Sequence, residues 1–463
     1  MILARLTRPV IAALLALSAC APMAPNNGVT RQTATFDTLP AMRIPASAPA
    51  PATRRSNASI ATEFMALVFQ LESGRKLPVL SRFEGPVTLR VTGAPVAAVS
   101  MRDLDRLIAR LRSEAHVPIS RVEPDQRANI TVHFLKRAKL RNAVPHAACF
   151  VAPGVDNWRD FTRRPNAPGR DWTQLTVRET MAVFLPADVS PQEIRDCLHE
   201  EIAQALGPVN DLYHLTDSIF NDDNFHTVLT GFDMVILRAM YHPDLRSGMT
   251  PGAVARRLPG ILNRINPNGR GGSGEFISNT PRRWIAEIEA ALGARGTGSA
   301  QLTAARRAVA IATENGWNDN RLGFSLYAQG RLALAQNSGL ALNSFEQADT
   351  IFRSNPETRL HAAHVSVQSA AFALSSGRPL AAIKIVDDNS AVALRAENPN
   401  LLATLLMIKA AALDASGRSA QGDIVRLDSL GWARYGLAST GEIRKRLSEI
   451  TALAPRITAK ANQ

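Results

Sequence analysis

The chain has 463 residues, of which 46% are hydrophobic and 20% are charged, as in an ordinary folded protein. This length is too great for one hydrophobic core, so we expect two or three domains. The net charge of +13 is not concentrated in Lys/Arg runs with interleaved aromatics, which argues against a nucleic-acid partner. We expect a basic surface that faces anionic envelope polymers or lipid headgroups.

Residues 1–19 predict a signal peptide, because positive charge precedes an apolar run that is too short to span a bilayer of ~30 Å. Residues 17–20, Leu-Ser-Ala-Cys, resemble the lipobox of bacterial lipoproteins. The resemblance implies cleavage before Cys20 and lipid on its thiol, which would anchor the protein to a membrane. Ala21, where an aspartate would favour the inner membrane, implies the periplasmic face of the outer membrane. No later segment offers another membrane attachment.

Residues 20–56 are rich in Pro, Ala, Ser and Thr, which predicts a disordered tether. A first domain, α+β with a mixed sheet, is expected over residues 57–268. Alternating apolar residues predict three strands, and helical periodicity predicts a helix between the first two. A further helix carries carboxylates and ends before Gly207 and Pro208. The expected strands are 87–91, 129–134 and 180–185, and the expected helices are 101–114 and 191–206.

Two cysteines remain once Cys20 is assigned to lipid. Cys149 lies at a predicted strand end, and Cys197 lies in the second predicted helix. In an oxidising compartment such a pair is expected to form a disulfide, which would stabilise the fold by ~3–4 kcal/mol in the chain-entropy model. A catalytic or metal-binding cysteine has no supporting spacing.

The second half of the chain predicts an all-helical region. A glycine cluster in residues 269–281 predicts a linker, since no Gly-Lys-Ser/Thr follows it as in a phosphate-binding loop. From 282 to 455, Ser-Gly turns recur and alternate with Asn-Pro pairs. The pattern resembles tetratricopeptide repeats, although its period exceeds their usual ~34 residues. The resemblance implies stacked helical hairpins with a surface for a peptide or protein partner.

The helix expected over 191–206 carries the candidate site. Read from His199, it fails the zinc-protease pattern, because Ala203 stands where the second histidine must be. Read one residue later, it places a ligand, a base, a ligand, a turn glycine and a last ligand on the five fixed positions of the metzincin pattern. These residues are Glu200, Glu201, Gln204, Gly207 and Asn210.

The sequence from 180 to 241 is similar to metzincins beyond this helix. Ser218-Ile219-Phe220 stands in place of their Ser-x-Met turn, and Leu229, Asp233, Met240 and Tyr241 follow as in the next helix. The resemblance implies Glu201 as a general base, with metal ligands at Glu200, Gln204 and Asn210, or at Asp211 instead. These are oxygen donors, which suit Zn²⁺ poorly and a harder ion better. No cofactor is therefore favoured, and a divalent metal remains open.

The same residues resemble an uncharacterised family of bacterial lipoproteins, domain of unknown function 2927. Its segments correspond to residues 197–211, 218–222 and 241–249. The resemblance implies that the Glu-Glu-x-x-Gln pattern is the family's own form of the site, and it brings no known reaction.

Three functional hypotheses stay open. The first is an envelope lipoprotein that binds or scaffolds partners without catalysis. The second is a metal-dependent hydrolase of envelope protein or peptidoglycan peptides, with Glu201 as base, and the third is a peptidoglycan-binding module. A calcium site at Asp217, Asp222 and Asp223 is weakly supported, because the acidic run lacks the spacing of a calcium loop.

Overall fold

The computed structural model describes residues 39–46, 48–145, 147–164, 167, 169–274, 279–293 and 296–455. The predicted signal peptide and Cys20 lie outside these ranges. Residues from Pro40 onward form one compact unit. Within the described ranges, no helix has the length and apolar character needed to cross a membrane.

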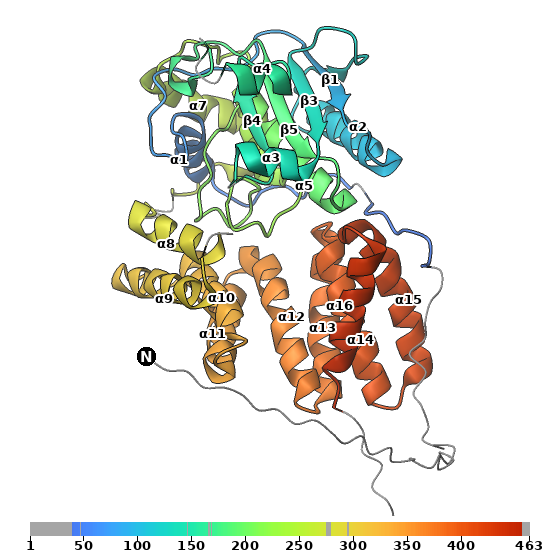
Figure 1. Ribbon diagram of the computed structural model, residues 1–463. Helices are drawn as coiled ribbons and strands as arrows, with labels where there is room; N and C mark the ends of the chain where they lie inside the picture. Colours follow the sequence, from blue (N-terminus) through green and yellow to red (C-terminus); the bar gives the residue numbers. More distant parts are fainter. Residues whose placement is uncertain are drawn as a thin grey trace, which may run out of the picture. The chain divides into compact units, whose positions relative to one another are not determined.

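A five-stranded mixed sheet forms the first part of this unit (Figure 1). Its strand order is β2-β1-β3-β5-β4. The first four strands in this order run parallel, and the edge strand β4 runs antiparallel to β5. The three predicted strands are present within two residues of their expected bounds. The strands are β1 (Val87–Gly93), β2 (Ile119–Arg121), β3 (Ile130–Leu135), β4 (Phe150–Pro153) and β5 (Met181–Pro186).

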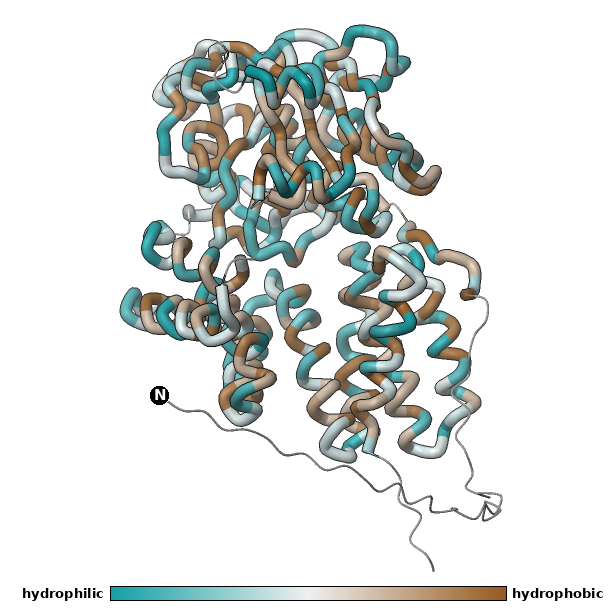
Figure 2. Tube along the Cα trace, viewed as in Figure 1, coloured by the Kyte–Doolittle hydropathy of each residue, from teal (hydrophilic) through white to brown (hydrophobic). Residues whose placement is uncertain are grey.

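Strand β5 is buried on both faces, because its side chains alternate between two cores. Met181, Val183 and Leu185 join the larger core, and Ala182 and Phe184 join the smaller one. The tube in Figure 2 shows hydrophobic residues along the strands as well as along the helices. Residues of α1 (Asn57–Val68), α2 (Ala98–Ser113), α5 (Pro191–Leu206), α6 (Gly231–Met240) and α7 (Pro251–Ile265) contribute to the larger core, and those of α3 (Arg137–Ala143) and α4 (Trp158–Arg163) to the smaller one.

The rest of the unit is helical, as predicted, and each helix packs against the next along the chain. The predicted Ser-Gly turns 376–377 and 416–417 separate consecutive helices, and Gly377 and Gly417 adopt positive φ angles of 71° and 79° there. The helices are α8 (Arg282–Leu292), α9 (Gly298–Glu314), α10 (Asn320–Ala333), α11 (Ser338–Ser354), α12 (Arg359–Ser375), α13 (Pro379–Arg395), α14 (Pro399–Ala415), α15 (Ser419–Gly436) and α16 (Thr440–Ala452).

Part of the segment expected to be a tether belongs to the compact unit. The Arg43 N–H donates to the Gly431 carbonyl at 2.9 Å, and the Arg43 guanidinium pairs with Asp428 at 2.7 Å. The Ala50 N–H donates to Glu114 at 3.1 Å. The folded unit therefore begins near Pro40 rather than at residue 57. Composition alone could not show this, because backbone groups and arginines make the contacts where apolar side chains are scarce.

The glycine-rich segment that follows α7 in the chain also packs against this N-terminal part. The Ser56 hydroxyl donates to the Ser273 carbonyl at 2.9 Å. A Cβ on Gly272 would lie 2.6 Å from the Ser56 Cβ, so the close approach requires glycine. Residues 269–274 of the predicted linker are thus in contact with the start of α1.

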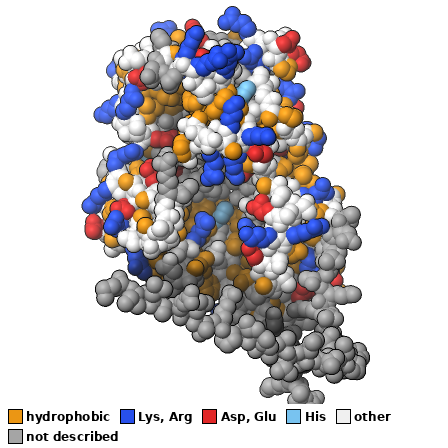
Figure 3. All heavy atoms as spheres, in the orientation of Figure 1, with side chains coloured by type: hydrophobic (Ala, Val, Ile, Leu, Met, Phe, Trp, Pro, Cys, Tyr) orange, Lys and Arg blue, Asp and Glu red, His pale blue; other side chains and the backbone are white. Residues whose placement is uncertain are grey.

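The sheet-containing part and the helical part share polar contacts within the unit. The Gln192 amide donates to Asn398 at 3.0 Å, and the Tyr435 hydroxyl donates to Asp103 at 2.7 Å. Lysine and arginine side chains are dispersed over the face shown in Figure 3, in keeping with the basic composition.

Candidate functional site

Helix α5 has the predicted bounds, 191–206, because both of its ends are capped. At the N-terminus, the Ser190 hydroxyl accepts from the Glu193 N–H at 3.1 Å, and Pro191 occupies the first turn. At the C-terminus, the Tyr241 hydroxyl donates to the Leu206 carbonyl at 3.0 Å.

Arg178 caps the same C-terminus and was not found from the sequence. Its guanidinium donates to the carbonyls of Gln204, Ala205 and Gly207 at 2.6, 2.8 and 2.7 Å. Burial lowers the pKa of Arg178 to about 10, so the side chain stays cationic at neutral pH and complements the helix dipole. A lone arginine between predicted elements gives no sequence signal for this role.

The predicted disulfide between Cys149 and Cys197 is confirmed. Cys149 directly precedes the edge strand β4, and Cys197 lies in α5. The bond therefore joins the strand and the helix that form two sides of the candidate site.

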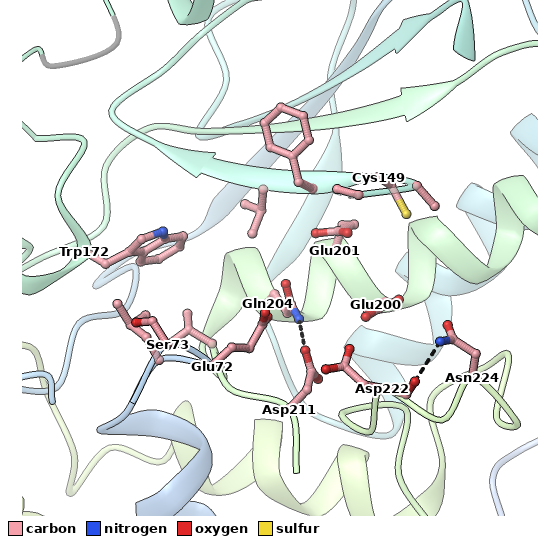
Figure 4. A pocket seen from close by; sticks show the side chains of 16 residues that line it. Glu72, Ser73, Cys149, Trp172, Glu200, Glu201, Gln204, Asp211, Asp222 and Asn224 are labelled. Carbon is pink, nitrogen blue, oxygen red and sulfur yellow. Dashed lines mark hydrogen bonds between the residues drawn. The ribbon is translucent and has the colours of Figure 1, made fainter. Parts of the chain in front are cut away.

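A pocket of about 510 Å³ opens beside α5 (Figure 4). Its acidic residues come from three parts of the chain: the loop after α1, helix α5, and the segment between α5 and α6. Its lining comprises Leu71, Glu72, Ser73, Ala147, Ala148, Cys149, Phe150, Val151, Trp172, Glu200, Glu201, Gln204, Val209, Asp211, Asp222 and Asn224.

Burial raises the pKa of Glu200, Glu201, Asp211 and Asp222 in this pocket, and neighbouring acids raise it further. The pKa of Glu200 rises to about 8, first through desolvation and then through the charges of Asp222 and Glu72. The pKa of Asp222 rises to about 7 for the same reasons, although a hydrogen bond from the Tyr213 hydroxyl opposes the rise.

Two carboxylate oxygens in the pocket lack a partner. Glu201 Oε2 and Asp211 Oδ1 are buried and have no hydrogen bond. The other oxygen of Asp211 accepts from the Gln204 amide at 3.2 Å. Desolvation raises the pKa of both carboxyls well above the usual range, and a backbone hydrogen bond from Val151 opposes this for Glu201.

The pocket brings together Glu200, Glu201, Gln204 and Asp211, but not Asn210. The Asn210 amide donates instead to the Ala66 carbonyl at 3.0 Å. Among the described residues, no group of three or more His, Cys, Asp or Glu side chains is placed to hold a metal ion. The donor set in these positions therefore does not fit a single metal ion of the metzincin kind.

His199 faces away from the pocket and braces the helix. Its Nδ1 accepts from the Leu229 N–H at 3.1 Å, which places the proton of the neutral ring on Nε2. Burial and nearby arginines hold its pKa well below the ordinary value. His199 thus links α5 to the end of the segment that leads into α6.

The turn expected to replace the metzincin methionine turn is fixed by Asp233. The Ile219 N–H donates to Asp233 at 3.1 Å, and the Ser218 hydroxyl donates to its other oxygen. Asp233 also completes a capping box with Thr230 at the start of α6. Phe220 is fully buried in the larger core.

The acidic run considered for calcium is divided among three environments. Asp217 pairs with Arg55 at 2.6 Å, and Asp223 lies 3.0 Å from the His361 ring nitrogen. Asp222 alone of the three lines the pocket. The run therefore does not form a calcium loop, and it supplies one pocket carboxylate whose role the spacing did not reveal.

The segment that carries Asp222 contacts two parts of the molecule. Asp222 and Asn224 line the pocket, as Figure 4 shows. Asp223 and Phe225 face the helical part, where the Phe225 ring centroid lies 4.5 Å from that of His361. Residues 222–225 therefore contact the pocket and the helices alternately.

Comparison with known families identifies the sheet-containing part. Residues 57–260 match the family model described as "Protein of unknown function (DUF2927)". The predicted resemblance to that family is thus confirmed for this segment, and helices α8 to α16 lie beyond it. Neither the curated proteins nor the solved structures gave a match.

Proposed function

We propose that the chain is a cell-envelope lipoprotein that binds ligands and partners without catalysis. In this proposal, lipid on Cys20 holds it at the periplasmic face of the outer membrane. A metzincin-like domain binds a ligand in the carboxylate pocket, and tetratricopeptide-like hairpins bind a protein or peptide partner. The observation that carries the proposal is the pocket itself, whose polar lining is formed mainly by carboxyl and amide side chains, of which Glu201, Gln204 and Asp211 are buried.

Several contacts support a metzincin-like domain. Helix α5 presents Glu200 and Glu201 beside an antiparallel edge strand. Tyr241 and Asp233, which follow the spacing of the metzincin helix, hold the end of α5 and the turn at Ser218. The sequence resemblance therefore corresponds to contacts that shape the site.

The protonation of the pocket favours binding over catalysis. A general base must be ionised near the working pH, whereas burial and Glu200 raise the pKa of Glu201 well above its usual range. Metal ligands must also be deprotonated, and Asn210 is turned to the backbone. These features argue against an ionised general base at Glu201 and against a metal ligand at Asn210, which the hydrolase hypothesis requires.

Elemental analysis and a peptidase assay on the purified full chain test this proposal. We expect less than roughly a tenth of an equivalent of divalent metal and no cleavage of envelope peptides. Stoichiometric metal that is lost in Glu200→Ala, with a peptidase activity abolished by Glu201→Gln, would overturn it. Glu193→Gln, on the same helix but outside the pocket lining, is the matched control.

One observation favours the metal-dependent hydrolase as a second candidate. Glu200, Glu201, Gln204 and Asp211 share a single pocket, as a shifted metzincin frame requires when Asp211 replaces Asn210. The same two measurements decide between the candidates.

The lipid anchor has a separate test. Cells that express the chain are fed a clickable palmitate analogue, and the protein is isolated from membranes. We expect label on the protein, and Cys20→Ser should lose both the label and sedimentation with membranes. An unlabelled wild-type chain would contradict the anchor.

A further inference from the structure

The carboxylate pocket gathers acidic side chains without a cationic partner in the part of the chain that the structure describes. Five acidic side chains line it, and neither lysine nor arginine is present among its described lining residues. Two acids elsewhere in the unit, by contrast, have cationic partners. Glu397 lies 3.2 Å from the Arg195 guanidinium, and Asp217 lies 2.6 Å from Arg55. The pocket carboxyls thus lack the internal cation that buried acids normally require.

Two of these carboxyls also each have one oxygen without a hydrogen-bond donor. Glu201 and Asp211 are 5% and 9% exposed, and each keeps one buried oxygen without a partner. Buried polar atoms in folded proteins are satisfied with few exceptions, and the exceptions concentrate at functional sites. Both oxygens belong to residues that line the pocket, so a ligand with several N–H donors would satisfy them.

The acids are spread around the pocket and do not converge on one point. The cavity measures about 510 Å³, and the described residues offer no group of three or more side chains placed for a metal ion. A divalent ion needs its oxygens within roughly 2.0–2.6 Å of one centre. The arrangement therefore suits a cation whose charges are distributed over several atoms.

The remaining lining suits an aliphatic chain. Leu71, Phe150, Val151 and Trp172 line the pocket together with the acids, and Figure 4 shows Trp172 on the side away from Glu200 and Asp222. Aromatic and aliphatic walls accommodate the methylene stem of an ammonium or guanidinium group, while carboxylates bind its head.

We infer that this pocket is a binding site for an extended organic cation, a ligand with ammonium or guanidinium groups on a flexible aliphatic chain. An ammonium supplies three donors and a guanidinium five. The inference rests on the proposed function, in which the domain binds a ligand without cleaving it.

Calorimetric titration of the full chain with spermidine and with tetralysine tests the inference. We expect saturable binding of both, and no binding of tetralysine with acetylated side chains, because acetylation removes the charge. Glu200→Gln and Asp222→Asn are each expected to weaken binding about tenfold or more, the effect of losing one partner of a partly buried charge pair. Glu193→Gln, whose side chain pairs with Arg137 outside the pocket, should bind as the wild type does.

Different results of the titration would contradict the organic-cation site and the proposed function. Equal affinities in Glu200→Gln and Glu193→Gln, or no binding of either polycation, would overturn the organic-cation site. Saturable binding of CaCl2, MgCl2 or ZnCl2 in its place would overturn it as well, and would leave a non-catalytic binding domain. Cleavage of tetralysine that Glu201→Gln abolishes would overturn the proposed function. Thermal unfolding of each variant confirms that it is folded.

Discussion

Glu200 shows what burial among like charges does to a single side chain. An unfolded glutamate loses its proton near pH 4.5, whereas folded Glu200 keeps its proton up to a pKa of about 8. Between these values the folded state binds more protons than the unfolded state, so the free energy of unfolding falls as the pH rises. Folding therefore favours the protonated form of this site.

Replacing Glu200 by glutamine should remove this pH dependence. We expect Glu200→Gln to raise the free energy of unfolding by about 1–3 kcal/mol near pH 9, and by less than ~0.5 kcal/mol near pH 5, because only the ionised form is unfavourable. Urea denaturation at both pH values measures the difference. An equal effect at the two pH values would show that folding does not raise the pKa of this carboxyl.

The sequence located part of the candidate site because helical spacing alone sets it. Glu200, Glu201 and Gln204 lie on one stretch of α5, and Asp211 follows five residues after its end. Glu72 lies 128 positions before Glu200 in the chain and joins them only through tertiary structure. No local pattern could reveal it, and no local pattern showed that Asn210 turns toward Ala66.

At the scale of elements, α5 is held by contacts at both ends, and Arg178 makes three hydrogen bonds at its C-terminal end. Replacing a fully buried arginine that satisfies three carbonyls leaves those acceptors without donors. We expect Arg178→Leu to lower the free energy of unfolding by about 3–5 kcal/mol. Arg121→Leu, which loses an exposed pair with Asp105, should change it by less than ~1 kcal/mol. Similar losses in the two variants would contradict the capping role.

The disulfide restrains the same helix from its other side. Cys149 and Cys197 are separated by 48 residues, so reduction frees a long loop in the unfolded chain. We expect the double variant Cys149→Ser, Cys197→Ser to lose about 3–4 kcal/mol of unfolding free energy. Denaturation of the wild type with and without reductant is the matching measurement, and reductant should not affect the variant. An unchanged midpoint on reduction would contradict this expectation.

Elements with strong periodicity were predicted well, and short elements were not. Helix α5 has its expected bounds because serine, proline and glycine mark its ends. Strands β2 and β4 have three and four residues, too few for alternation to be recognised. The segment near Arg43 packs against α15 through a backbone hydrogen bond and an ion pair that composition does not encode.

At the scale of the whole molecule, Phe225 joins the pocket segment to the helices. Its ring lies among aromatic residues of the helical part, with centroids 4.7 Å from His364 and 5.8 Å from Phe324. Removing the ring should loosen the position of Asp222. We expect Phe225→Ala to weaken polycation binding by about three- to tenfold, within the usual range of coupling between sites.

Phe345→Ala is the control for this effect, because Phe345 is also buried in the helical part but belongs to α11 and not to the segment that carries Asp222. Both variants should lose about 3–5 kcal/mol of stability. Calorimetry under conditions where both are folded should show weaker binding in Phe225→Ala alone. Equal binding in the two variants would show that the helices do not position the pocket.

The alternating contacts of residues 222–225 have a thermodynamic consequence. A partner that stabilises the helices around His361 would reduce the conformational freedom of Asp222, and a ligand held by Asp222 would do the same for Phe225. Such coupling is reciprocal, so each ligand changes the affinity of the other by the same factor. Occupancy of the pocket would then change the affinity of these helices for a partner, and the reverse would hold as well.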